Sequence, residues 1–390
     1  MACMSELGPS GGQGGNPFGF LGDLMKMFMT DGPLNWQIAR QAALVAATGG
    51  ELEPNVDPLA RVRMEELLRV ADLHVSDMTG LTPGGLMTVR AVTRAEWAYY
   101  TLDHYRSLFE GLAGALTSGV PPVQPQDAEA GLLGSLPQVL GPFFLGAQAG
   151  TMCGHLARQA MGQYELPIPR PVSNELMVVP TTITAFASDW SLPEDDVRMW
   201  VCVSELAHHA VLQRPGVRAR LEALLEEFVR GFHVDPSALG VQLDQLDLSD
   251  PSSFPQLFNN PEALLGAVTT PAQHDAEVQL AAVVCAVEGY VDHIVDVVGH
   301  RLVSSFGPLT EALRRRRATP SDADELIREL FGLELSQAAY DRGDRFVRGV
   351  LERAGEDGLA RLWRSERELP TPAEVDAPGL WLERIDIPAE

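Results

Sequence analysis

The sequence has very little positive charge. It contains a single lysine, Lys26, and 29 basic residues in total against 53 acidic residues, so the formal net charge is −24. Nucleic acids and anionic membrane surfaces require a positive face, which a chain this acidic does not provide. We therefore expect neither among its partners. The one basic run, Arg314–Arg317, falls at the end of a predicted helix, where the helix dipole favours cations and we expect a solvated end.

Cysteine is scarce as well. No two of the four cysteines have the C-x-x-C spacing of redox and zinc sites, and three of them lie in apolar helical stretches: Cys153, Cys202 and Cys285. A reduced, buried thiol is the ordinary state there. Residues 1–15 also lack the basic and apolar regions of a secretory signal. We therefore expect a cytoplasmic protein without disulfides.

One long segment lacks charge altogether. No Asp, Glu, Lys or Arg occurs from Ala130 to Ala157, a length that could span a bilayer. Pro137 and Pro142 interrupt the segment, however, and glycines recur through it. We expect buried core helices in which the glycines permit close backbone contact. The alternative is a membrane-associated scaffold that uses this segment together with the apolar residues 18–29.

Strand patterns are rare and helix patterns are frequent. Residues 1–30 are Gly-rich and predicted to be flexible, with a short apolar amphipathic segment at 18–29, whereas residues 31–390 are predicted to form one domain. The hydrophobic spacing and capping residues predict helices over residues 35–47, 58–78, 94–117, 215–232 and 271–302, and further helices within 308–357. The best strand candidate is Glu175–Ala187, in which Pro180 indicates either an edge strand or an interruption. Residues 234–262 are predicted to be a long loop. The sequence thus predicts a mainly α fold with a small β element before a central helix.

The central helix is predicted to begin near Pro193. Ser191 and Glu194 have the spacing of a capping box, and Pro193 suits the first helical turn. An apolar body follows, and then the run Ser204-Glu205-Leu206-Ala207-His208-His209.

This run resembles the zinc-binding motif H-E-x-x-H with its first histidine replaced by Ser204. On a helix, that motif directs two imidazoles at one metal, while the glutamate acts as general base on the bound water. Glu205 and His208 keep the base and second-ligand positions, but a neutral serine hydroxyl is a poor zinc ligand. A shift by one residue would pair Glu205 with His209, but would then place at the base position Leu206, which cannot accept a proton.

A second candidate lies in the long predicted helix 271–302. Glu288 and Asp292 are four residues apart, so they share one face within an apolar run, where carboxylates without partners are costly. They either contribute to a metal site or pair with Arg or His across the core. His208 and His209 either bind a metal or are imidazoles with satisfied hydrogen bonds packed on a helix face, while His293 and His300 fit a structural role better.

Taken together, several stretches resemble the actinobacterial zincin-like metallopeptidases, a family associated with biosynthesis of a deazaflavin coenzyme. The resemblance covers about residues 35–384. It rests on six stretches: Asn35–Arg40, Phe186–Trp190, Trp200–His209, Glu288–His293, Tyr340–Val347 and Pro370–Glu374.

The resemblance implies a mostly helical zincin-like domain that hydrolyses peptides with zinc. By position it makes Glu205 the general base, His208 and Glu288 metal ligands, and Asp292 the acid that orients a ligand histidine. The family has histidine at the position of Ser204, so we expect zinc binding to be impaired.

Two outcomes stay open. Water, His209 or His293 could replace the missing ligand and preserve hydrolysis. Alternatively, the protein is a pseudopeptidase that binds a peptide or a partner protein. The sequence identifies neither a substrate nor an oligomeric state.

Overall fold

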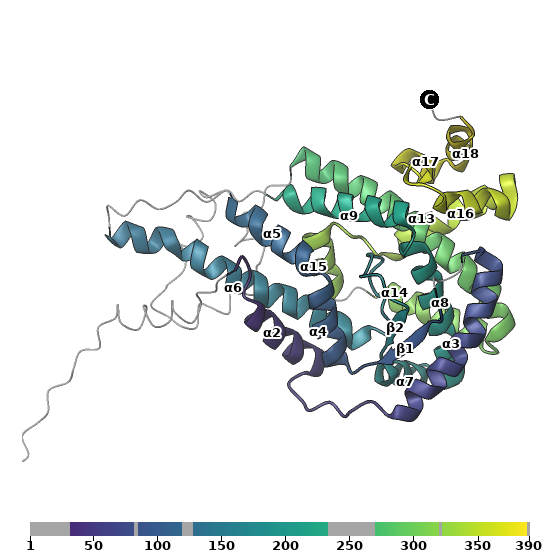
Figure 1. Ribbon diagram of the computed structural model, residues 1–390, viewed down its shortest axis with the longest axis horizontal. Helices are drawn as coiled ribbons and strands as arrows, with labels where there is room; N and C mark the ends of the chain where they lie inside the picture. Colours follow the sequence, from purple (N-terminus) through teal and green to yellow (C-terminus); the bar gives the residue numbers. More distant parts are fainter. Residues whose placement is uncertain (1–31, 82–84, 119–127, 233–269, 320–321, 388–390) are drawn as a thin grey trace, which may run out of the picture.

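Helices account for most of the computed structural model, which describes residues 32–81, 85–118, 128–232, 270–319 and 322–387 (Figure 1). The first half contains α2 (Trp36–Thr48), α3 (Pro58–Thr79), α4 (Arg94–His104), α5 (Arg106–Ser118), α6 (Ala128–Gln159), α7 (Pro180–Asp189), α8 (Glu194–Leu212) and α9 (Pro215–Arg230). The second half contains α13 (Pro271–Leu302), α14 (Phe306–Arg317), α15 (Asp322–Phe331), α16 (Gln337–Leu359), α17 (Pro372–Asp376) and α18 (Pro378–Asp386), with short 3₁₀ turns at Ala360–Trp363 and Glu366–Glu368. The predicted mainly α fold is confirmed. The predictions for residues 1–30 and 234–262 lie outside the described residues, and the assignment of 31–390 to one domain stays a prediction.

Local capping signals place several helices where they were predicted. The side chains of Asn35, Asp57 and Thr270 accept hydrogen bonds from backbone N–H groups of α2, α3 and α13, respectively. Thr93 and Glu96 form a reciprocal capping box at the start of α4. The predicted helix over 94–117 is divided in two, because α4 ends before Tyr105 and α5 begins after it.

The strand prediction is correct only for its first four residues. β1 (Thr88–Ala91) and β2 (Glu175–Val178) pair in parallel, with Thr88 opposite Glu175. Pro180 then begins α7, since its fixed φ and missing N–H suit the first turn of a helix. The small β element therefore does precede the central helix, as predicted.

The predicted capping box of the central helix α8 is wrong. Ser191 has a positive φ of 53°, and Pro193 occupies the N-cap position without a side-chain hydrogen bond. The carboxylate of Glu194 accepts hydrogen bonds from Thr184 and Arg198 instead. Tertiary contacts hold the start of α8. In one of them, the Asp196 carboxylate accepts a hydrogen bond from the backbone N–H of Ser305, the residue that precedes α14.

The uncharged segment forms the single helix α6, which Pro142 does not end, and it packs along α2. A Cβ atom at any of three α6 glycines would overlap α2: Gly146, Gly150 and Gly154. The expected close contact at glycines is confirmed. None of the helices in the described ranges combines the length and apolar character that crossing a bilayer requires.

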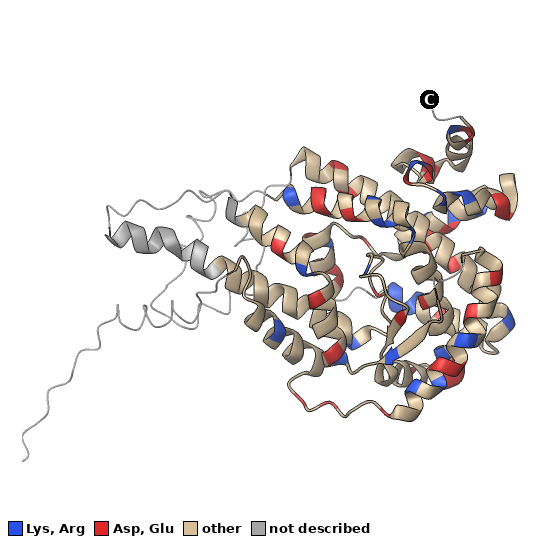
Figure 2. Cartoon of the chain, viewed as in Figure 1, with Lys and Arg blue, Asp and Glu red and all other residues tan. Residues whose placement is uncertain are grey.

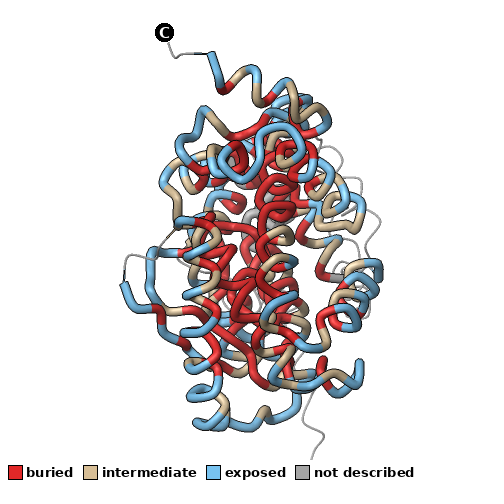
Figure 3. The backbone as a smooth tube through the Cα atoms, turned by 90° about the vertical axis from the view of Figure 1, so that its right-hand side faces the viewer, coloured by how far each residue is buried: buried red, intermediate tan, exposed pale blue. Residues whose placement is uncertain are grey.

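The core surrounds α8 and α13. Helix α8 packs against α3 and α13, and α13 packs in turn against α9 and α16. Buried backbone forms a continuous interior in Figure 3, with exposed segments around it, while Figure 2 shows acidic and basic residues dispersed over the helices rather than segregated. Helices α13 and α16 lie close together at Gly289 and Gly343, where a Cβ atom on either residue would overlap backbone of the other helix. This crossing lies one residue from Glu288.

Candidate active site

The two central helices bring His208 of α8 against Glu288 of α13. His208 Nε2 lies 3.3 Å from Glu288 Oε1, and the residues are only 6% and 5% exposed. On the other side of the ring, His208 Nδ1 lies 2.9 Å from the backbone carbonyl oxygen of Ser204. Both ring nitrogens therefore face acceptors, and only a doubly protonated imidazolium can donate to both. The geometry is that of a buried ion pair.

The electrostatic balance agrees with this assignment. Burial lowers the pKa of His208, but the carboxylates of Glu288 and Glu205 outweigh burial and raise it to about 9. Burial likewise raises the pKa of Glu288, but His208 and a hydrogen bond from Tyr340 hold it below its ordinary value. Each member of the pair thus stabilises the charge of the other.

Ser204 and Glu205 occupy the positions that precede His208 on α8. Ser204 Oγ lies 3.5 Å from His208 Nδ1 and is buried. The Glu205 carboxylate accepts a 2.7 Å hydrogen bond from the Gln163 backbone N–H and a 3.1 Å bond from that of Tyr164. Burial raises the pKa of Glu205 to about 7, although His208 and these N–H groups oppose the rise. Glu205 is therefore a buried acid anchored to the 163–164 backbone.

His209 points to a different partner. Its Nδ1 lies 2.9 Å from the Tyr164 hydroxyl, and burial lowers the pKa of His209 to about 4. The Tyr164 ring also stacks on His208, with centroids 5.9 Å apart and an interplanar angle of 18°. Tyr164 was not among the predicted site residues, because its position after the end of α6 carries no signal for contact with α8.

Asp292 and His293 do not reach His208. Asp292 accepts a bidentate pair of hydrogen bonds from Arg317 at 3.0 and 3.1 Å, and His293 Nε2 lies 3.1 Å from Glu356. The structure therefore brings together Ser204, Glu205, His208 and Glu288, and it places Asp292 and His293 on other partners. The interpretation in which the two α13 carboxylates pair with His and Arg across the core describes this arrangement.

The basic run at the end of α14 is solvated only in part. Arg314 and Arg315 are exposed, as predicted. Arg316 and Arg317 are half-buried: Arg316 binds Glu165 at 2.8 Å, and Arg317 binds Asp292. The prediction is wrong for these two residues, because half-buried carboxylates on neighbouring elements, Glu165 and Asp292, pair with them.

The donor set does not fit a catalytic zinc ion. Such sites use three protein ligands, and within the described residues no three His, Cys, Asp or Glu side chains are arranged to hold a metal. A tetrahedral zinc with bonds of about 2.0–2.2 Å separates adjacent ligand atoms by about 3.3–3.5 Å, so the 3.3 Å between His208 and Glu288 suits two of its ligands. The third position, however, offers only the hydroxyl of Ser204.

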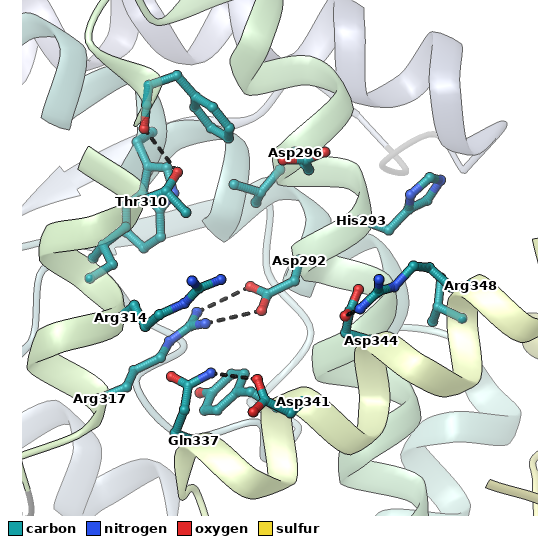
Figure 4. Close-up of a pocket in the computed structure, with 16 residues that line it drawn as sticks. Asp292, His293, Asp296, Thr310, Arg314, Arg317, Gln337, Asp341, Asp344 and Arg348 are labelled. Carbon is teal, nitrogen blue, oxygen red and sulfur yellow. Dashed lines mark hydrogen bonds and ion pairs between the residues drawn. The ribbon is translucent and has the colours of Figure 1, made fainter. Parts of the chain in front are cut away.

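A polar cavity of about 270 Å³ adjoins this site (Figure 4). It lies between α13, α14 and α16, with Trp200 of α8 at one side. Arg317 and Tyr340 line it and also contribute to the electrostatics of Glu288. Figure 4 shows Arg314 and Arg317 extending from α14 toward Asp292.

Comparisons with known proteins agree with this architecture. The family model described as zincin-like metallopeptidase matches residues 34–382. A crystal structure from Chloroflexus aurantiacus, described as "a putative hydrolase with a novel fold", has a TM-score of 0.65 and 22% sequence identity to this chain. The match covers 91% of this chain and 100% of that one, and at this identity it shows a shared fold. No curated protein matches the sequence.

Proposed function

Because the chain belongs to the zincin-like metallopeptidase family, we propose that it is a hydrolase-family protein whose zinc binding is impaired or lost. One observation carries the proposal. Ser204 stands at the first ligand position, and the atoms of His208 and Glu288 that would bind zinc are bonded to each other. In this proposal, the imidazolium charge of His208 takes the place of the metal charge beside Glu288.

The consequence for activity follows from protonation. A histidine binds zinc through an unprotonated nitrogen, so zinc must displace the Nε2 proton of an imidazolium whose pKa is about 9. Zinc would also bind with two strong donors instead of three. We infer that the native chain acts by binding a peptide or partner protein, as a pseudopeptidase, rather than by zinc-dependent hydrolysis.

Hydrolysis is the second candidate, and one specific observation favours it. Glu205 keeps the general-base position, and its pKa of about 7 suits proton transfer at neutral pH. The spacing of His208 and Glu288 also suits two adjacent zinc ligands. If zinc binds with a substitute ligand, Glu205 has the chemistry that activation of a water molecule requires.

The cellular context belongs to the same proposal. The buried, unpaired thiols of Cys153, Cys202 and Cys285 support a cytoplasmic location. The acidic charge argues against nucleic acid as the partner. An association with deazaflavin-coenzyme biosynthesis and an actinobacterial origin, both implied by the resemblance, stay predictions.

Elemental analysis of the untagged protein tests the proposal. We expect the native chain to retain little zinc after dialysis and Ser204→His to retain about one zinc per chain. Ser76→His, which adds a histidine on α3 at a position that bonds to Asp72 and not to a residue of the site, is the control and should resemble the native chain. About one zinc in the native protein, lost in both His208→Ala and Glu288→Ala, would overturn the proposal and establish a site with a substitute ligand.

A peptide-hydrolysis assay then separates the two candidate functions. Ser204→His loaded with zinc should gain hydrolysis, and the further change Glu205→Gln should abolish it. Because Glu205 also holds backbone N–H groups, the folding of that variant must be verified by circular dichroism. Native hydrolysis that depends on Glu205 and on zinc would favour the second candidate.

A further inference from the structure

The cavity between α13, α14 and α16 has the size of a small-molecule site. Its volume of about 270 Å³ lies just below the range of about 300–1,000 Å³ that is typical of ligand pockets. A molecule of amino-acid or dipeptide size fits this space, whereas a folded partner or a long peptide does not. One part of the lining is apolar and is formed by Val295, Phe306 and Leu313.

The charges of the lining are partly neutralised within the protein. Four aspartates and three arginines line the cavity, which gives a net charge of −1 (3 − 4). Arg317 is paired with Asp292, and Arg348 with Asp344. These pairs leave one arginine and two aspartates: Arg314, Asp296 and Asp341.

These three side chains have only weak partners or none. Asp296 lies 3.5 Å from the exposed imidazole of His300, and Asp341 accepts a 2.8 Å hydrogen bond from the neutral amide of Gln337. For Arg314, the described part of the chain provides no hydrogen-bond or ion-pair partner. The cation belongs to α14, whereas the carboxylates belong to α13 and α16, so opposite charges stand on different walls of one cavity (Figure 4).

This distribution selects among ligand classes. A simple anion would meet a net negative lining, and a simple cation would leave Arg314 without a counter-charge. A ligand with one carboxylate and one ammonium group satisfies both walls through charge-assisted hydrogen bonds. We propose that the cavity binds a small zwitterion, an amino acid or dipeptide with an apolar side chain. In this site Arg314 holds the ligand carboxylate, Asp296 and Asp341 hold the ammonium group, and Phe306 contacts the side chain.

Isothermal titration calorimetry on the full chain tests the assignment directly. The probes are L-leucine and L-leucyl-L-leucine, which distinguish a free amino acid from a dipeptide, together with N-acetyl-L-leucine and L-leucinamide, each of which lacks one charge. We expect at least one zwitterion to bind and both blocked compounds to bind about tenfold more weakly or worse, since each loses a charge-assisted contact. The readout is binding and not hydrolysis, so the result is independent of whether zinc binds at His208.

Variants locate the site. Arg314→Gln should weaken zwitterion binding about tenfold or more, and Asp296→Asn combined with Asp341→Asn should have a similar effect. Arg315→Gln is the matched control, because Arg315 is the adjacent exposed arginine, pairs with Glu311 and does not line the cavity. Absence of binding by both zwitterions, equal binding of the blocked compounds, or unchanged binding in Arg314→Gln would each overturn the proposal.

Discussion

Removing one partner of the His208–Glu288 pair should destabilise the protein strongly, and removing both should not. A rise of the His208 pKa from its usual 6.5 to about 9 corresponds to about 3 kcal/mol of differential stabilisation. Breaking a buried ion pair typically costs about 3–5 kcal/mol, because a buried charge is left without compensation. We therefore expect Glu288→Leu and His208→Leu each to lower the free energy of unfolding by about 3 kcal/mol or more at pH 6.

The double variant isolates the interaction. With both charges replaced by leucine, no uncompensated charge remains, so the loss should fall short of the sum of the single losses by about 3 kcal/mol. Urea unfolding followed by circular dichroism measures all three values. The control is the pair His293 and Glu356, whose side chains are 3.1 Å apart but with Glu356 exposed, and for which a coupling of about 0–1 kcal/mol is expected.

The pH dependence of the free energy of unfolding tests the His208–Glu288 pair independently. The folded-state pKa of His208 is raised, so its stabilisation is fully present below pH 6.5 and is lost as the pH rises through about 9. Glu288→Gln should remove this part of the stability profile and lower the His208 pKa, which NMR of the imidazole signals reports. Single losses that add to within about 0.5 kcal/mol, as they do for distant sites, would refute the ion-pair assignment.

Three further outcomes are expected. Gly343→Ala should lower the free energy of unfolding in urea by about 1–3 kcal/mol, because the added Cβ overlaps α13 backbone. Gly307→Ala, with open space around it, should change that free energy by no more than about 0.5 kcal/mol, and equal losses would contradict the crossing geometry. Burial raises the pKa of Cys153 to about 12 and raises that of Cys202 further, so mass spectrometry should find both unalkylated by iodoacetamide at pH 8 until urea unfolds the chain; rapid native labelling of either would count against this packing. The raised pKa of Glu205 contributes stability that is present below pH 4.5 and is lost as the pH rises through about 7. Glu205→Gln should remove this pH dependence of the thermal unfolding temperature, and a variant that keeps it would show that another group is responsible.

Features that depend on a few neighbouring residues could be predicted from the sequence. The N-caps at Asn35, Asp57 and Thr93 need only their own side chains and the next turn of backbone, and the helices that they begin start within one residue of the predicted positions. The spacing at Ser191 and Glu194 is an equally good local signal, yet Glu194 bonds to Thr184 and Arg198 instead. Tertiary partners overrode the local preference there, and the sequence pattern contains no information about them.

The candidate site divides in the same way. Glu205 and His208 follow from helical spacing within one motif, and Glu288 follows from the cost of a carboxylate in an apolar helix. The partners of the site residues come from elsewhere in the fold. Arg317 donates hydrogen bonds to Asp292, which therefore does not contact His208, and the Tyr164 ring stacks on His208. Those contacts depend on how α14 and the residues after α6 pack against α8 and α13, which one sequence does not specify.

The glycine crossing of α13 and α16 has a consequence for how such a site can change over time. Gly289 and Gly343 bring the two backbones together with no side chains between them, one residue from Glu288. Main-chain contact therefore fixes the backbone from which Glu288 extends, while its carboxylate contacts His208. A substitution on α8 at position 204 does not alter the α13–α16 contact beside Glu288. The frame of α13 and α16 is therefore in place for any side chain at position 204 of α8, including the histidine of the Ser204→His variant.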